Sequence, residues 1–193
     1  SWGRDIFIPR YKDFEAESQK MYTDSVSFCT APTVEGLDSL QQQWWSTRTP
    51  WKELEYLKFG PFKEFPHRLG TKIDFWPVRT DTVQEILSGD TELEETTFDT
   101  LGASAKGLPV LEYLLYDTEN IPFTDSRTCA YLVGSSYDLS IRAKEMREAW
   151  DTEEGNYLSQ LTQAEEMKGD FNTTEEALAE VVNRLGHTIE NIR

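Results

Sequence analysis

Apolar side chains recur along most of this chain at steps of three and four residues, the spacing that places them on one face of an α-helix. Ile8, Tyr11 and Phe14 follow this spacing near the start of the chain. The strict alternation of apolar and polar residues that marks a half-buried strand is nearly absent. The sequence therefore predicts an all-α protein built of amphipathic helices.

The predicted helices are joined by short connections, which favours up-and-down packing in helical bundles. Residues 60–80 are the exception, because they are rich in proline and aromatic side chains, and we predict a packed non-helical segment there. Pro50 predicts either a kink or a restarted helix. We expect helices at about residues 4–28, 34–58, 81–87, 92–101, 108–116, 125–150, 156–167 and 174–192.

The chain is strongly acidic. It has 193 residues, with 35 Asp and Glu against 19 Lys and Arg, and a formal net charge of −16. Such a surface repels phosphate backbones, so we expect no nucleic acid as a partner. No apolar run reaches the roughly 18 residues of a membrane-spanning helix, so we predict no transmembrane segment.

Sequence motifs of common enzymes are missing. The chain has no G-x-S-x-G nucleophile turn, no glycine-rich phosphate loop and no H-E-x-x-H zinc motif. Its two histidines, His67 and His187, have no partner at helical spacing with which to hold zinc. We interpret His67 as a loop residue that forms hydrogen bonds and His187 as an ordinary residue near the end of a helix.

Glu112 is a carboxylate within the most apolar run of the chain, residues 108–116. An isolated buried charge is very costly, so this group must be paired, hydrogen-bonded or protonated. It could form a structural ion pair, or it could line a binding cleft. The candidate basic partners are Arg48, Arg68, Arg79 and Lys106.

Two further groups of charged residues stand among aromatic ones. Trp44, Arg48, Trp51 and Glu55 are expected on one helix face. Arg48 and Glu55 would then lie one turn on either side of Trp51. Asp74 lies in an apolar stretch that includes Trp76. Both groups suit core tryptophans accompanied by an ion pair, and both suit the wall of a ligand pocket.

The two cysteines, Cys29 and Cys129, are a hundred residues apart, and neither belongs to a C-x-x-C motif. A zinc ribbon and a thioredoxin motif are thereby excluded. One structural disulfide in an oxidising compartment fits the residues as well as two separate buried thiols do.

Together and in this order, three segments of the chain resemble the imelysin-like family, in particular its branch of predicted periplasmic lipoproteins. The resemblance covers about residues 1–150, and the whole chain is similar to the front part of a longer protein. The matching residues are Trp45, Arg48, Trp51, Glu55 and Phe59–Pro61, then Ile73, Asp74, Trp76 and Pro77, then Gly102 and Lys106–Leu115.

The resemblance implies two helical bundles. We expect a first bundle at residues 1–150, which carries the segment Gly107–Glu112, and the start of a second, incomplete bundle at residues 151–193. It also implies a periplasmic or outer-membrane-anchored protein of a Gram-negative bacterium, with any N-terminal lipid anchor outside this chain. Iron, haem or an envelope protein would then be the partner, and iron or another divalent ion would be the cofactor.

Some members of the family are called metallopeptidases because of a G-x-H-x-x-E motif. The corresponding residues here run from Gly107 to Glu112, and Pro109 stands in place of the histidine. Proline has no ligand atom and suits the first turn of a helix instead. The resemblance therefore gives little support to peptidase activity, and Glu112 is the one motif-based candidate for a metal ligand.

We accordingly predict a non-catalytic envelope binding protein, with a metallopeptidase of the imelysin type and a structural or protein-interaction module as alternatives. An envelope location favours a Cys29–Cys129 disulfide. By closing a loop of about a hundred residues, it would stabilise the folded state by about 4–5 kcal/mol at most in the chain-entropy model. The predicted ligand site consists of Arg48, Trp51, Glu55, Asp74, Trp76, Lys106 and Glu112.

Overall fold

The computed structural model describes residues 3–64, 67–117, 123–151, 155–167 and 169–190. Within these ranges the secondary structure is helical and contains no strand, which confirms the all-α prediction. None of the described helices combines the length and the apolar character that crossing a membrane requires. Residues 191 and 192, the expected end of the last helix, lie outside the described ranges.

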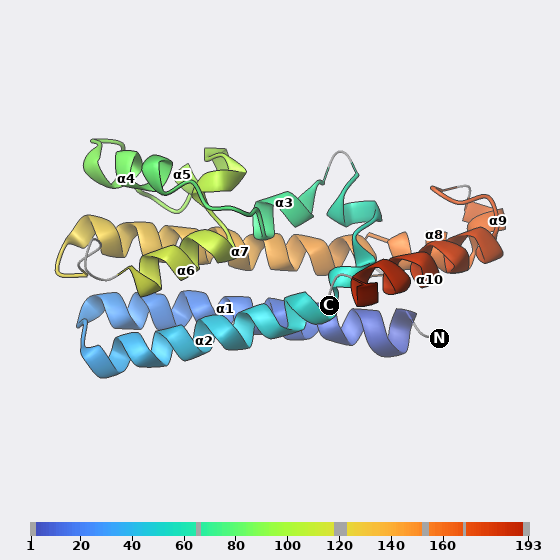
Figure 1. Ribbon diagram of the computed structural model, residues 1–193, viewed down its shortest axis with the longest axis horizontal. Coiled ribbons are helices and arrows are strands. Elements are labelled where there is room, and N and C mark those ends of the chain that lie inside the picture. Colours follow the sequence, from blue (N-terminus) through green and yellow to red (C-terminus); the bar gives the residue numbers. More distant parts are fainter. Residues whose placement is uncertain (1–2, 65–66, 118–122, 152–154, 168, 191–193) are drawn as a thin grey trace.

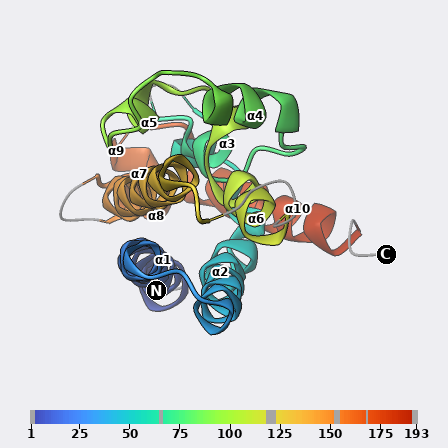
Figure 2. The ribbon, with the colours of Figure 1, turned by 90° about the vertical axis from the view of Figure 1, so that its left-hand side faces the viewer.

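Four helices form the body of the molecule. They are α1 (Ile8–Thr30), α2 (Val34–Glu53), α6 (Leu108–Tyr116) and α7 (Ser126–Trp150). Helix α1 packs against α2 and α7, and α6 also packs against α2 and α7. Seen end-on, the four lie at the corners of a four-helix bundle (Figure 2). This arrangement agrees with the predicted bundle packing.

The bundle core follows from the helical spacing of the apolar residues. Thr33 caps the start of α2 by accepting a hydrogen bond from the backbone N–H of Gly36 at 3.0 Å. On α7, Gly134 lets the ring of Phe98 approach closely, because a Cβ at this position would lie 2.1 Å from the ring. The buried apolar residues of α1 are Ile8, Tyr11, Phe14, Met21 and Phe28.

A layer of short elements covers α6 and α7 on the side away from α1 and α2 (Figures 1 and 2). It includes α3, α4 and α5. Two predictions fail here. Residues 60–80 are not wholly non-helical, because they contain α3, and the helix expected at 92–101 is reduced to α5. The elements of the layer are 3-10 turns at Gly60–Phe62 and Ala103–Ala105, with α3 (Leu69–Ile73), α4 (Thr80–Ser88) and α5 (Thr97–Thr100).

Helix α2 continues through Pro50 and ends at Glu53. Proline removes one backbone donor, and here that loss falls in the last turns of the helix. The predicted second helical stretch is therefore shorter than 34–58, and the next residues form a 3-10 turn instead. Because of this early end, the turn at Glu55–Leu57 does not continue the helical spacing from Arg48 and Trp51.

The C-terminal helices α8 (Tyr157–Thr162), α9 (Ala164–Met167) and α10 (Thr174–Glu190) lie at the end of the bundle where the chain begins (Figure 1). The single helix expected at 156–167 is thus two short helices. Helix α10 buries Ala177 and Val181. Its exposed apolar side chains are Leu178, Val182 and Ile189, with exposed fractions of 52%, 54% and 66%.

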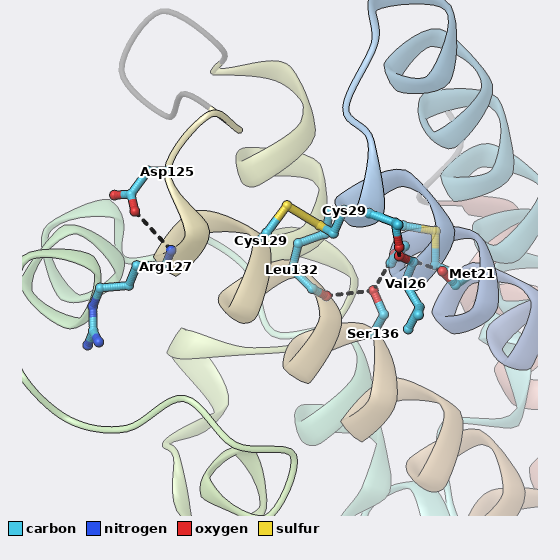
Figure 3. The surroundings of a disulfide bond; sticks show 10 residues. Met21, Val26, Cys29, Asp125, Arg127, Cys129, Leu132 and Ser136 are labelled. Carbon is cyan, nitrogen blue, oxygen red and sulfur yellow. Dashed lines mark hydrogen bonds between the residues drawn. A yellow bond between two sulfur atoms is a disulfide. The ribbon is translucent and has the colours of Figure 1, made fainter.

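A disulfide joins Cys29, near the end of α1, to Cys129 in the first turn of α7 (Figure 3). The two Cα atoms lie 5.5 Å apart although the residues are separated by 100 positions. Farther along the same interface, the hydroxyl oxygens of Ser25 and Ser136 lie 3.0 Å apart in a buried hydrogen bond. The two long helices are therefore held together covalently at one end.

Candidate functional site

Arg48 on α2 is surrounded by tryptophan rings. Its Cζ atom lies 5.4 Å from the ring centroid of Trp44, 6.0 Å from that of Trp45 and 5.8 Å from that of Trp76. These distances are within the range of cation–π attraction. Trp44 is buried, whereas Trp45 and Trp76 are 55% and 46% exposed.

Asp74, directly after α3, holds two of the indole rings. One carboxylate oxygen, Oδ2, accepts a hydrogen bond from Trp51 Nε1 at 2.9 Å. The other, Oδ1, accepts one from Trp76 Nε1 at 2.6 Å. Trp51 also stacks on Phe62 with a centroid distance of 5.6 Å. Both oxygens of Asp74 are thus engaged, and the orientation of two rings is fixed.

Glu112 on α6 faces this group without a direct partner. Its Oε2 atom is buried and accepts no hydrogen bond, and Nε of Arg48 is buried and donates none. Burial raises the pKa of Glu112, Arg48 acts to lower it and Asp74 acts to raise it further. Among the described residues, no basic side chain forms a direct ion pair with Glu112. The charges of Arg48 and Glu112 are therefore coupled without being in contact.

The segment that begins α6 sets the position of Glu112. Gly107 has φ +84°, and a Cβ there would lie 2.5 Å from the backbone oxygen of Ile73. Glycine is needed for this close approach, which brings the start of α6 against the residue that precedes Asp74. Pro109 is buried in the first turn of α6, as the sequence predicts.

We call the group formed by these residues the indole cluster. Its members come from α2, from the segment after α3 and from α6. Five of the seven residues predicted for the ligand site are brought together in it. The indole cluster consists of Trp44, Trp45, Arg48, Trp51, Asp74, Trp76 and Glu112.

Glu55 does not belong to the indole cluster. The prediction that it shares a helix face with Arg48 and Trp51 is wrong, because α2 ends at Glu53 and Glu55 lies in a 3-10 turn. Its carboxylate pairs with Lys52 at 2.7 Å and Lys58 at 2.6 Å. Burial acts to raise the pKa of Glu55, but the hydrogen bonds from the two lysines outweigh it and lower the pKa.

Lys106 is also elsewhere and is not the partner of Glu112. It is 2% exposed, and its Nζ donates to the backbone oxygen of Phe98 at 2.7 Å and to Asp138 Oδ1 at 3.2 Å. Burial lowers the pKa of Lys106, and Asp138 opposes this effect. Arg142 Nε also donates to Asp138 Oδ1, at 3.3 Å. The side chain thus points to α7 and not toward the indole cluster.

We call this second group the paired cluster. Arg142 extends it toward the surface, where its terminal nitrogens donate to Glu145 at 2.6 Å and Asp99 at 2.7 Å. Each basic group in it has at least one acidic partner in direct contact. The paired cluster consists of Lys106, Asp138 and Arg142 with Asp99 and Glu145.

The predicted ligand site did not include Trp44 or Trp45, although the sequence places Trp44 on the same helix face as Arg48. Both rings lie within one turn of Arg48 on this helix, and that spacing could have identified them. The paired cluster was also missed. Asp138 and Arg142 are four residues apart, the spacing of an ion pair along a helix, but only the fold shows that Lys106 joins them.

The residues of the indole cluster do not fit a metal ion held by the protein. Across the part of the chain that the structure describes, no three His, Cys, Asp or Glu side chains gather in an arrangement that could hold one. Pro109 stands where the family motif has histidine, and both oxygens of Asp74 are occupied by indole N–H groups. His67 and His187 are exposed.

Comparison with known proteins gives one family and two solved structures. The family profile described as Imelysin matches residues 7–193. An imelysin-like protein from Psychrobacter arcticum has a TM-score of 0.77 and 21% identity, over 99% of this chain and 58% of that one. A protein from Parabacteroides distasonis, described as an iron-regulated protein A precursor, has a TM-score of 0.76 and 18% identity, over 93% and 52%. No curated protein sequence matches.

Both solved structures share the fold of this chain. At identities of 21% and 18%, the likeness concerns the fold alone. The chain spans 58% and 52% of the lengths of the two solved chains, so each of them contains a substantial part that has no counterpart here.

Proposed function

The chain belongs to the imelysin family, and from that premise we propose that it is a non-catalytic binding protein of the cell envelope, linked to the acquisition of iron or haem. The indole cluster is its proposed ligand site. Arg48 and Glu112 carry the charges of this site, Trp45 and Trp76 provide its exposed aromatic surface, and Asp74 fixes the rings.

The main support for the proposal is that the charges of Arg48 and Glu112 lie near each other without forming a direct ion pair. Buried polar atoms in proteins are almost always hydrogen-bonded, and leaving one unpaired costs about 1–3 kcal/mol. The indole cluster contains two such atoms, Arg48 Nε and Glu112 Oε2. Asp138 Oδ2 of the paired cluster is also without a hydrogen bond, but Asp138 forms two direct ion pairs, whereas neither Arg48 nor Glu112 forms one with a described residue. A group that served only to hold the fold together would gain by closing this pair. An open pair among exposed rings is typical of a site that awaits a ligand.

Binding is favoured over hydrolysis. An imelysin-type metallopeptidase needs a set of metal ligands, and the indole cluster offers Glu112 without the histidine of the motif. A purely structural module would have its charges in direct contact, as Lys106 and Asp138 are in the paired cluster. The indole cluster does not have this feature.

Two observations support the link to iron and to the envelope. One of the solved structures with this fold is described as an iron-regulated protein A precursor. The Cys29–Cys129 disulfide suits an oxidising compartment such as the periplasm. We propose a periplasmic or outer-membrane-anchored location in a Gram-negative bacterium. Fractionation of the native host should recover the protein with the envelope, and recovery with the cytoplasm would contradict this location.

We also propose that residues 1–150 form a first bundle domain and that residues 151–193 begin a second helical part. On one face, α10 joins the core that contains Phe7 and Trp150, through Ala177 and Val181. Its exposed side chains Leu178, Val182 and Ile189 leave another face available for a further helical part. Beside α10 lies an apolar pocket of about 310 Å³, lined by residues that include Phe7, Leu158 and Val181. The greater length of the two solved chains agrees with a further helical part.

Titration of the purified chain tests the proposed function. Haemin, ferric citrate and divalent cations would be added separately while tryptophan fluorescence is recorded. We expect saturable binding of at least one iron compound, weakened about tenfold or more in Arg48→Met, because a charge-assisted hydrogen bond contributes about 1.5–3 kcal/mol. Arg184→Met on α10, which removes an arginine paired with Glu180, is the matched control. Absence of binding, or equal binding by Arg48→Met, would contradict the proposal.

A further inference from the structure

The exposed surface of the indole cluster is aromatic. Trp45 and Trp76 leave about half of their side chains in contact with solvent, and Tyr116 is 46% exposed beside Trp44, with a ring centroid distance of 6.2 Å. Trp45 and Tyr116 both contact the buried Trp44, and Trp45 and Trp76 both lie near Arg48. Partly exposed aromatic side chains gathered in this way are typical of a binding surface, since the exposed half of each ring lacks the hydrophobic stabilisation that burial provides.

The rings are held in place before any ligand arrives. Trp44 Nε1 donates to the backbone oxygen of Leu108 at 2.9 Å, and the ring of Trp45 meets that of Trp44 edge to face at 4.8 Å. Trp76 is fixed by its hydrogen bond to Asp74. A rigid aromatic surface loses little conformational entropy when a flat molecule binds to it. The rings therefore suit a flat ligand better than a compact ion.

The positive charge at this surface comes from Arg48. No described residue accepts a hydrogen bond from its guanidinium, and because Nε is buried, its terminal nitrogens supply the donors that a ligand can reach. A guanidinium is planar, stacks on aromatic faces and binds a carboxylate through two parallel hydrogen bonds. The nearby carboxylate of Asp74 does not compete, because both of its oxygens accept from indole N–H groups.

The indole cluster lacks most of the side chains that commonly bind metal ions. The indole cluster contains no histidine, cysteine or methionine, and the described part of the chain gathers no metal-binding group of three such acidic, imidazole or thiol side chains. Tyr116 and Glu112 are oxygen donors beside this surface, but the three side chains that most often bind haem iron are missing from the indole cluster, so we expect a ligand that contains iron to be held mainly through its organic part. The side chains around Arg48 are indole rings, which contact the organic part of a ligand whether or not it holds a metal.

We propose that the indole cluster recognises a flat aromatic ligand that carries a carboxylate, and that its affinity does not depend on a metal in the ligand. Arg48 binds the carboxylate, and Trp45 and Trp76 contact the ring. The proposal rests on the proposed function and names the chemical class of its ligand.

The test compares four probes with the purified chain: haemin, metal-free protoporphyrin IX, the neutral dimethyl ester of protoporphyrin IX, and ferric citrate. We expect haemin and protoporphyrin IX to bind with dissociation constants within a factor of about three, because neither is coordinated by the protein. The dimethyl ester should bind about tenfold more weakly, since it lacks the charged group for Arg48. Ferric citrate should not compete with protoporphyrin IX.

Matched variants separate specific binding from adsorption of porphyrin to apolar surface. Trp76→Ala should weaken the binding of protoporphyrin IX about tenfold, as expected when a stacked ring is removed. Leu178→Ser removes an apolar side chain of similar exposure on α10 and should leave binding unchanged. If Leu178→Ser weakens binding as much as Trp76→Ala does, the porphyrin adsorbs to the surface and the inference is wrong.

The outcomes also separate this inference from the proposed function. Binding of haemin without binding of protoporphyrin IX would overturn the inference and leave the proposed function standing, because the metal would then be required. Binding of ferric citrate alone would have the same consequence. If no probe binds, both the inference and the proposed function are wrong.

Discussion

Two groups of charged residues lie within one helical protein and differ in how their charges are satisfied. In the paired cluster, Lys106 and Arg142 both contact Asp138, and all three side chains are buried. In the indole cluster, neither Arg48 nor Glu112 forms a direct ion pair with a described residue, and exposed rings lie beside them. A buried atom without a hydrogen bond occurs in both clusters, at Asp138 Oδ2 as well as at Arg48 Nε and Glu112 Oε2. Burial of charged groups is common to both clusters and does not distinguish them. They differ in whether each charge has a direct partner.

Breaking the paired cluster should have the largest effect. Asp138→Ala leaves Lys106 and Arg142 buried without their shared partner, and removal of one member of a buried ion pair costs about 3–5 kcal/mol. Urea unfolding should show this loss of stability. Asp24→Ala, which removes only an exposed ion pair with Lys20, should cost less than about 1 kcal/mol. Equal stability of the two variants would show that the paired cluster does not stabilise the fold.

Removing the disulfide should have the second largest effect. Replacement of both Cys29 and Cys129 by alanine frees a link between residues 100 positions apart, and such a change costs about 2–4 kcal/mol. The unfolding midpoint should fall, while the folded variant should bind ligand as the unaltered chain does, because the link lies between α1 and α7 and not at the indole cluster. Loss of binding by the folded variant would show that the indole cluster depends on this end of the bundle.

A substitution at Glu112 should have a smaller effect, and it should raise the stability of the fold where the two preceding changes lower it. Burial raises its pKa above the ordinary value of 4.5, so the folded protein holds this proton to higher pH than the unfolded chain does. Stability is therefore lost as pH rises from that ordinary value through the folded pKa. Glu112→Gln should thus raise the free energy of unfolding by about 1 kcal/mol at pH 7, since it replaces a poorly solvated charge by a neutral group.

The same variant has a built-in control, because the difference depends on ionisation. Below pH 4.5, where both states of the unaltered chain are protonated at this position, the stability of Glu112→Gln and that of the unaltered chain should converge. A loss of stability at pH 7 would show that the charge of Glu112 stabilises the fold. Glu112 would then be a structural residue like Asp138.

The sequence predicted much of the fold and part of the site. Helical periodicity identified the long helices, since apolar residues spaced three and four apart over about twenty residues indicate an amphipathic α-helix. The short elements were harder to predict. The helix expected at residues 92–101 has few apolar positions, and only Thr97–Thr100 are helical. Local turns of this kind are determined by the surface on which they pack.

For the candidate site, sequence reasoning named Trp51, Asp74 and Trp76, and the structure brings these three together through hydrogen bonds to Asp74. Sequence reasoning placed Glu55 wrongly because it extended α2 beyond Glu53. No residue pattern showed that the helix ends there, and the end of the helix decides where the side chain of Glu55 points. Sequence reasoning placed Lys106 wrongly because an ion pair with Asp138 joins residues 32 positions apart. Contacts at that separation come from tertiary packing and leave no trace in local spacing.

The central claim is that the indole cluster is a ligand site and not a structural group. One measurement tests it directly: urea unfolding of the unaltered chain and of Arg48→Met, with and without protoporphyrin IX. Without ligand, the two should differ by less than about 1 kcal/mol, the size of an exposed cation–π interaction. Ligand at a hundred times its dissociation constant should stabilise the unaltered chain by about 2.7 kcal/mol and Arg48→Met much less. A ligand-free loss of about 3 kcal/mol or more in Arg48→Met, with no stabilisation of either protein by ligand, would contradict the claim.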